Sequence, residues 1–207
     1  MEKLLNDVLL PYLNSKRPGN VDAYEGVVNV HTEDVNGSDS FDVVDTRFMD
    51  LPVVRQFGEG HASYLNDEHK YSLRIVMYED FLNELGDVAK GIRRPDLFVY
   101  TTGSDSYFII HELSVGSSSN KRKDGKHQLG NTVQLLNRIP QIKSFLSKFE
   151  HKLCILSGAE GAVSSPNGIA NGFSEIYSLI PNPEPLNCHF CESGGFEAYI
   201  THNVVLK

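Results

Sequence analysis

The stretch RRPDLFVYTTGSDSYFIIHELSV, residues 93–115, decides which fold we expect. It holds a run rich in β-branched and aromatic residues at 97–101, a turn sequence at 102–105 and an apolar run at 107–115. Two such runs around a glycine-containing turn predict a β-hairpin. Because the second run is largely apolar at odd and even positions alike, we expect a central strand that is covered on both faces.

The length of the turn decides which residues of this hairpin face each other. With a loop of three or five residues centred on Ser104, Asp96 faces Glu112 and their Cβ atoms lie ~5 Å apart on one face. With a loop of two or four residues, Asp96 faces His111, and Glu112 points to the opposite face. The sequence leaves both registers open.

Short apolar or alternating runs predict further strands on either side of the hairpin. These runs lie at 26–30, 41–45, 71–77, 152–157, 175–180 and 196–206. Helical spacing of apolar residues predicts helices within 4–12, 79–89 and 127–148, and Pro140 should kink or split the last of them. The polar segment 116–125 is expected to be a loop.

This order of elements predicts an α/β fold in which helices flank a mixed β-sheet. No internal repeat or linker divides the 207 residues, so we expect a single domain over 1–207. Its core spans about 71–157. An N-terminal helix and strands precede this core, and a C-terminal extension rich in Gly, Pro and Asn follows it after Gly158.

Composition narrows the class of protein. A hydrophobic fraction of 40% and a charged fraction of 22% exclude disordered, collagen-like and coiled-coil chains. No apolar run has the length of a membrane span or a signal peptide, and three cysteines fit a reducing compartment. We therefore expect cytoplasmic localisation and no membrane partner. A net charge of −8 excludes binding of nucleic acid by bulk charge, but it allows a local basic groove.

The residues that point to chemistry are Asp96 and Glu112. A charge inside an apolar strand costs several kcal/mol unless it is paired or bound to a metal, and two close buried carboxylates share a proton or bind a cation. Mg²⁺ and Mn²⁺ prefer such oxygen ligands and promote attack of water on phosphoryl groups. The alternatives are a turn cap at Asp96 and a buried salt bridge from Glu112 to Arg93, Arg94 or Lys126.

These residues resemble the PD-(D/E)XK nuclease superfamily. The resemblance covers roughly 71–157: Pro95-Asp96 starts a strand, a hairpin leads to Glu112 in the next strand, and a helix follows with Gln128 near its start. It implies a restriction-endonuclease-like core, Mg²⁺- or Mn²⁺-dependent hydrolysis of phosphodiester bonds, and a nucleic-acid partner. It also implies that Asp96 and Glu112 are metal ligands.

The lysine of the family pattern falls at position 114, where this chain has Ser114. Some relatives, such as the cap-snatching endonucleases of segmented RNA viruses, carry the lysine in the following loop or helix. Lys126 is the best substitute here, and Lys121 and Lys123 are weaker candidates. Relatives also often supply an upstream acid or histidine to the metal. The candidates for that ligand are Glu59, His61, Glu79 and Glu84.

Four basic residues are expected to position the substrate backbone, although solvated side chains would give the same pattern. They are Arg93, Arg94, Lys121 and Lys123. The leading hypothesis is a metal-dependent nuclease of DNA or RNA. Its rival is a catalytically inactive nuclease-like fold that serves as a binding or assembly module, as a homodimer or with a protein partner. Ser114 and the acidic net charge favour the rival.

Two further features have structural interpretations. His111 is expected to satisfy a local hydrogen bond rather than to bind metal. Cys188 and Cys191 have the spacing of half a zinc site, which Cys154 and His202 would complete only if the fold brought them there. A redox function of the Cys-x-x-Cys pair is disfavoured because no helix is predicted to follow it.

Overall fold

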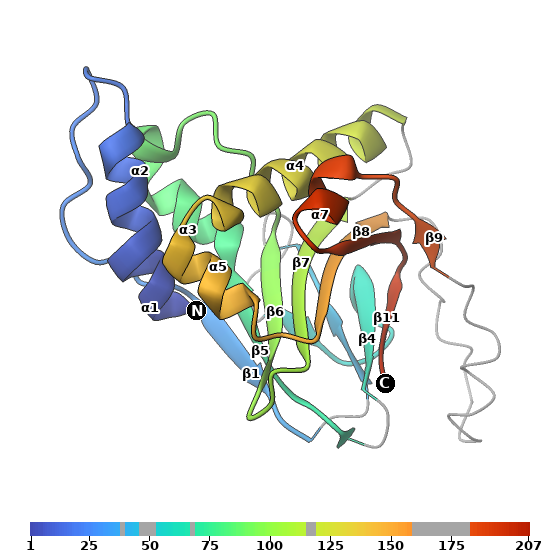
Figure 1. Cartoon of the computed structure of the whole chain (residues 1–207). Helices are drawn as coiled ribbons and strands as arrows, with labels where there is room; N and C mark the ends of the chain where they lie inside the picture. Colours follow the sequence, from blue (N-terminus) through green and yellow to red (C-terminus); the bar gives the residue numbers. More distant parts are fainter. Residues whose placement is uncertain (38–39, 46–52, 67–68, 115–118, 159–182) are drawn as a thin grey trace, which may run out of the picture.

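The computed structural model describes residues 1–37, 40–45, 53–66, 69–114, 119–158 and 183–207. The strands in these ranges form a seven-stranded and a four-stranded sheet, and helices lie against the larger sheet (Figure 1). The larger sheet has the order β1 (Thr32–Val35), β5 (Ser72–Met77), β6 (Leu97–Thr102), β7 (Tyr107–Ser114), β8 (His151–Gly158), β10 (Glu197–Ile200) and β9 (Glu184–Pro185). The smaller has the order β11 (Asn203–Leu206), β4 (Ala62–Asn66), β2 (Ser40–Val43) and β3 (Val54–Arg55).

The larger sheet is mixed. The pairs β1–β5, β5–β6, β6–β7 and β10–β9 are antiparallel, whereas β8 runs parallel to β7 and β10 runs parallel to β8. The helices are α1 (Glu2–Leu4), α2 (Leu10–Lys16), α3 (Tyr78–Glu84), α4 (Ser119–Asn137), α5 (Pro140–Leu146) and α7 (His189–Ser193). A π-helical turn, Leu5–Leu9, joins α1 to α2, and a 3₁₀ turn, Gly86–Ala89, follows α3. The expected α/β class is therefore confirmed. No helix in the described ranges is long and apolar enough to cross a membrane.

The β6–β7 hairpin adopts the register that places Asp96 opposite Glu112. Leu97 pairs with His111, so the preceding and following residues lie across from each other at the end of the ladder. The turn contains Gly103 at φ +79°, a backbone conformation that glycine adopts without a steric penalty. The odd-length loop is thus the one that forms.

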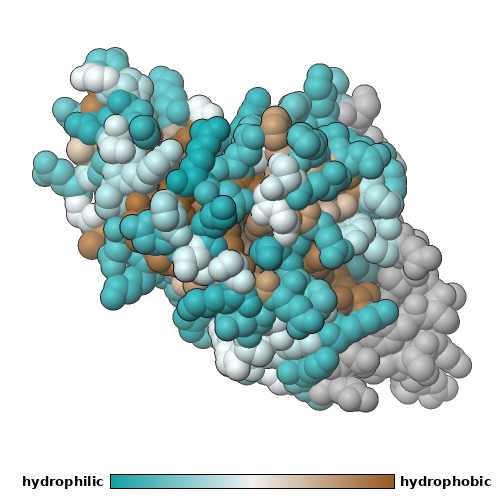
Figure 2. Space-filling view, viewed as in Figure 1, coloured by the Kyte–Doolittle hydropathy of each residue, from teal (hydrophilic) through white to brown (hydrophobic). Residues whose placement is uncertain are grey.

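Strand β7 is covered on both faces, as its apolar sequence predicts. On one face its side chains pack with α4 and α5; this core includes Phe98, Phe108, Ile110, Leu129, Val133 and Ile142. On the other they pack against the smaller sheet; this core includes Leu97, Val99, Ile109, Leu113, Phe41 and Tyr64. The face of the molecule in Figure 2 is largely hydrophilic, with hydrophobic side chains in scattered patches.

The helix after the hairpin is longer than expected. It begins at Ser119, so residues 119–125, expected to be a loop, form its first two turns. Those turns are polar and carry no apolar spacing that would reveal them in the sequence. The expected break at Pro140 is confirmed: Ile139 is extended (φ −105°, ψ 107°), because proline disfavours the helical conformation in the residue before it.

Two of the other expected strands differ from the structure, and a third lies outside the described residues. The strand expected at 26–30 is wrong, because the first strand is β1 at Thr32–Val35 and 27–30 have no regular structure. The strand expected at 196–206 is two strands, β10 and β11, which belong to different sheets. The strand expected at 175–180 lies outside the described residues.

His111 links the two sheets through hydrogen bonds. Its Nδ1 lies 2.8 Å from the Tyr64 hydroxyl and its Nε2 lies 2.7 Å from the Ser157 hydroxyl. Because Ser157 donates its one proton to the carbonyl oxygen of Thr201 (2.6 Å), it accepts from Nε2–H, and Nδ1 then accepts from Tyr64. Burial, together with the nearby His202, lowers the pKa of His111 to about 3. The ring is therefore neutral, and the expectation of a local hydrogen-bonding role is confirmed.

We predict that stability depends on pH through His111. In the unfolded chain this residue takes up a proton below its ordinary pKa of about 6.5, whereas the folded state resists protonation down to about 3. The contribution of neutral His111 to the free energy of unfolding is fully present above about pH 6.5. It declines as the pH falls toward 3, by up to about 1.4 kcal/mol per pH unit. Urea unfolding of wild type and His111→Gln between pH 7.5 and 4.5 measures this slope. Equal slopes in the two proteins would contradict the prediction.

Candidate metal centre

Three carboxylates from separate parts of the chain converge in this fold. One oxygen each from Asp45, Glu79 and Asp96 lies within 4.8 Å of the other two. Asp45 and Asp96 are 1% and 5% exposed, and Glu79 is half-buried. The three residues come from the end of β2, the first turn of α3 and the residue before β6.

Asp96 is held by hydrogen bonds to two elements. Its carbonyl oxygen accepts from the backbone N–H groups of Tyr78 (3.0 Å) and Glu79 (3.2 Å), at the start of α3. Its Oδ2 accepts from the N–H of Leu113 (2.5 Å) in β7, the residue after Glu112. Pro95 precedes it at the beginning of the strand, where the missing N–H leaves no ladder bond unmade. Asp96 thus fixes the start of α3 relative to the hairpin.

Glu79 is placed by that junction. It lies in the first turn of α3, where a negative side chain is favoured by the helix dipole. Of the four upstream candidates, Glu79 is the one that belongs to the carboxylate group. Glu84, at the other end of α3, accepts a hydrogen bond from the Tyr24 hydroxyl (3.3 Å), and Glu59 is exposed.

Asp45 was not found by sequence reasoning. It follows β2 of the smaller sheet, and its backbone N–H donates to Nδ1 of His61 (3.0 Å), so His61 supports the group through the chain rather than as a member of it. A second bond, from the N–H of His61 to the carbonyl of Val43 (2.8 Å), fixes the same turn. The only trace in the sequence is that Asp45 ends the apolar run 41–45.

Glu112 lies beside the group without belonging to it. It is 5% exposed and shares its side of the hairpin with Asp96. A Cβ atom added at Gly125 of α4 would lie 3.3 Å from Cγ of Glu112, so α4 covers this residue closely. Among the described residues, the oxygens that meet are those of Asp45, Glu79 and Asp96. The role of Glu112 as a metal ligand stays a prediction.

The cluster of three carboxylates, Asp45, Glu79 and Asp96, suits a hard divalent cation. At these separations, two ionised carboxylates repel by about 3–4 kcal/mol for an effective dielectric constant of about 20. Buried charges of one sign therefore need protons or a cation to balance them. An all-oxygen donor set is the one preferred by Mg²⁺, Mn²⁺ and Ca²⁺. The expected cofactor, Mg²⁺ or Mn²⁺, thus has a chemically suitable centre, although its ligand set differs from the expected pair.

Helix α4 directs one side toward the start of β6. Gln128 Nε2 donates to the carbonyl oxygen of Arg94 (2.8 Å), and Thr132 Oγ1 donates to that of Arg93 (3.4 Å). Lys121 lies one helical turn before Gly125 and two turns before Gln128, which puts it on this side. Lys126 lies on the side facing α7, where its carbonyl oxygen is 3.8 Å from Cys188 Sγ.

The other expected substrate-binding residues lie on the surface around this junction. Arg93 is exposed, and Arg94 is half-buried and donates from Nη1 to Oδ1 of Asn83 in α3. Lys123 is exposed on the first turns of α4. The neighbouring Arg122 forms an ion pair with Glu184 (2.7 Å).

Comparisons with models of known protein families, with curated proteins and with solved structures gave no match for this chain.

We predict that Gly60→Ala destabilises the protein at the turn whose hydrogen bonds hold Asp45. A Cβ atom there would lie 2.4 Å from Cβ of Asp42 and 2.8 Å from the carbonyl oxygen of Val43, and these atoms cannot rotate away. Overpacking of this kind costs ~1–3 kcal/mol. Chemical unfolding measures the loss, and Gly19→Ala, whose Cβ would have nothing within 4 Å, is the control. A Gly60→Ala protein as stable as this control would refute the prediction.

Proposed function

We propose that this protein is a divalent-metal-dependent nuclease that hydrolyses phosphodiester bonds of DNA or RNA. The observation that carries the proposal is the convergence of three carboxylates, two of them buried, at the Asp96 of the Pro-Asp motif. Mg²⁺ or Mn²⁺ would be held by Asp45, Glu79 and Asp96. Glu112, across the hairpin from Asp96, is a further candidate ligand.

The surroundings of the motif support the resemblance to the PD-(D/E)XK superfamily. Asp96 starts β6, the hairpin returns as β7 with Glu112 in it, and α4 and α5 lead to β8, which is parallel to β7. This order of strand, hairpin, strand, helix and parallel strand is the context that the motif requires. A restriction-endonuclease-like core is therefore part of the proposal.

The residues of this chain have separable tasks in the proposed reaction. When bound, the ion would activate a water molecule and stabilise negative charge on a phosphoryl oxygen. Asp96 and Asp45 are oriented by hydrogen bonds at their own backbone or carboxylate atoms, so the donor oxygens are preorganised. Half-buried Glu79 lies at the more exposed side of the group, where substrate would approach.

We propose Lys121 rather than Lys126 as the cation that stabilises developing charge, in place of the lysine missing at Ser114. Lys121 occupies the side of α4 that bonds to the 93–94 backbone, whereas Lys126 faces α7. Preorganised positive charge near the reacting phosphate lowers the barrier electrostatically. Arg93, Arg94 and Lys123 would position the backbone of the nucleic acid.

The second candidate is a nuclease-like fold without catalysis that acts as a binding or assembly module. It is favoured by Ser114 at the motif lysine and by the net charge of −8. This candidate requires no metal and no cleavage, so the two experiments below separate it from the nuclease.

We predict that the chain binds one Mn²⁺ ion through the carboxylate group. Isothermal titration should show that Asp96→Asn, Asp45→Asn and Glu79→Gln each weaken binding by at least ~10-fold, because each removes a negative donor. The variant Asp96→Asn keeps an oxygen that can accept from Leu113 N–H. The control is Asp105→Asn, an exposed residue in the turn of the same hairpin. Absence of heat in the wild type would exclude the proposed centre.

We predict that cleavage of nucleic acid depends on Lys121 more than on Lys126. With Mn²⁺ and plasmid DNA or single-stranded RNA, Lys121→Gln should lower the rate by ~100-fold, the size of effect seen when one stabilising donor is removed, and Lys126→Gln by much less. Asp96→Asn supplies the inactive reference. The reverse order of the two lysine variants would assign the role to Lys126. A wild type that binds Mn²⁺ and cleaves neither substrate would favour the binding module.

A further inference from the structure

The three cysteines meet in the interior between β8, α4 and α7. The Sγ atoms of Cys188 and Cys191 are hydrogen-bonded to each other at 2.9 Å, and Cys154 of β8 is also hydrogen-bonded to Cys191. All three are buried; Cys154 and Cys191 are 0% exposed and Cys188 is 2% exposed. The sequence predicts no helix after the Cys-x-x-Cys pair, and the structure corrects this: Cys188 immediately precedes α7, which contains Cys191.

A shared metal ion does not account for this arrangement. Among the described residues, which include all three cysteines, only Asp45, Glu79 and Asp96 bring ligand atoms close enough together to share an ion. His202, the fourth zinc ligand considered from the sequence, lies near His111 instead. The Sγ atoms of Cys188 and Cys191, 2.9 Å apart, thus form a pair, and Cys154 contacts Cys191.

We propose that Cys188 and Cys191 form a reversible intrachain disulfide when the protein meets a hydroperoxide. This proposal is independent of the proposed nuclease function. A disulfide requires the sulfurs to approach to about 2.05 Å. The remaining gap of less than ~1 Å can be closed by side-chain rotation at the two ends of one helical turn.

The reaction balances with hydrogen peroxide as the oxidant. The thiolate of one cysteine attacks a peroxide oxygen, the O–O bond breaks, and the leaving hydroxide takes up a proton as water, which gives a sulfenic acid. The other cysteine then attacks that sulfur, the S–O bond breaks, and a second water leaves as the disulfide forms. Two thiols are oxidised by two electrons, and one peroxide is reduced to two water molecules. A dithiol reductant reverses the change by thiol–disulfide exchange.

The surroundings of the two thiols set the rate of attack. The hydrogen bond with Cys191 and burial raise the pKa of Cys188, and the hydrogen bond with Cys154, together with burial, raises that of Cys191. The positive charge of Lys126 acts in the opposite direction on Cys188, but the hydrogen bond and burial outweigh it. Since the thiolate is the reactive form, oxidation should be slow at neutral pH and faster at higher pH.

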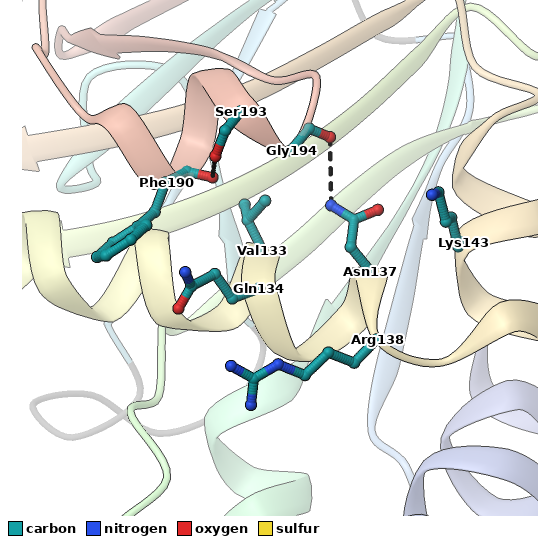
Figure 3. Close-up of a pocket in the computed structure, with 8 residues that line it drawn as sticks. All are labelled: Val133, Gln134, Asn137, Arg138, Lys143, Phe190, Ser193 and Gly194. Carbon is teal, nitrogen blue, oxygen red and sulfur yellow. Dashed lines mark hydrogen bonds between the residues drawn. The ribbon is translucent and has the colours of Figure 1, made fainter.

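The pair lies at the contact between α4 and α7. A Cβ atom at Gly130 of α4 would lie 3.2 Å from Cys188 Sγ, and Asn137 Nδ2 donates to the carbonyl of Gly194 (3.2 Å) further along the same contact. A pocket of about 270 Å³ opens between the two helices, lined by residues such as Val133, Phe190 and Ser193 (Figure 3). A disulfide would therefore constrain the first turn of α7 at its contact with α4.

We predict that peroxide treatment of the folded full-length chain removes two hydrogen atoms, a mass loss of about 2 Da that a dithiol reverses. Peptide mapping should find a link between Cys188 and Cys191. The oxidation rate at pH 9 should exceed that at pH 7, because more of the thiol is ionised at the higher pH.

Serine variants of the three cysteines distinguish the proposed Cys188–Cys191 disulfide from one that involves Cys154. Cys154→Ser should retain the mass loss, whereas Cys188→Ser and Cys191→Ser should abolish it. If a serine variant does not fold, the map of the wild type decides by itself. Three results would overturn the proposal: no mass loss in the folded wild type, a link that contains Cys154, or a stoichiometric zinc ion in the purified protein that Cys188→Ser removes.

Discussion

The hydrogen bonds of Asp96 are the constraint on which the candidate centre depends. Its carbonyl oxygen receives the first two amides of α3, and its carboxylate receives the amide of Leu113 in β7. One residue thereby joins the helix that carries Glu79 to the hairpin that carries Glu112. The junction forms only in the odd-length register of β6 and β7, since a slip by one residue would turn Glu112 to the other face.

The smaller sheet completes this centre from the other side. It contributes Asp45 at the end of β2, and it is joined to the larger sheet by a shared apolar core and by the hydrogen bonds of Tyr64, His111 and Ser157. A neutral histidine in that position is compatible with burial, whereas a protonated one would lack a compensating charge. The stability of the sheet contact and the position of Asp45 are therefore physically connected.

Two glycines of α4 allow this helix to pack closely against its neighbours on two sides. Gly125 allows the helix to lie against Leu156 and Glu112, and Gly130 allows it to lie against Cys188 and Phe190. Because these glycines have no side chain, α4 packs closely on the sheet and on α7 at once. The candidate metal centre and the thiol pair thus lie at different sides of one helix, which gives α4 a part in both proposals.

The sequence alone determined the local features: the hairpin, the buried two-sided strand, the break at Pro140 and the position of Asp96 at the start of the hairpin. These follow from periodicity and turn chemistry, which act over a few residues. Tertiary structure decided the rest. Asp45 and Glu79 join Asp96 because a second sheet and a helix start converge there, and the polar turns at 119–125 place Lys121, rather than Lys126, toward the start of β6. The three cysteines likewise meet through packing of β8 and α7. Contacts between residues distant in sequence depend on how whole elements pack, and no local pattern encodes that arrangement.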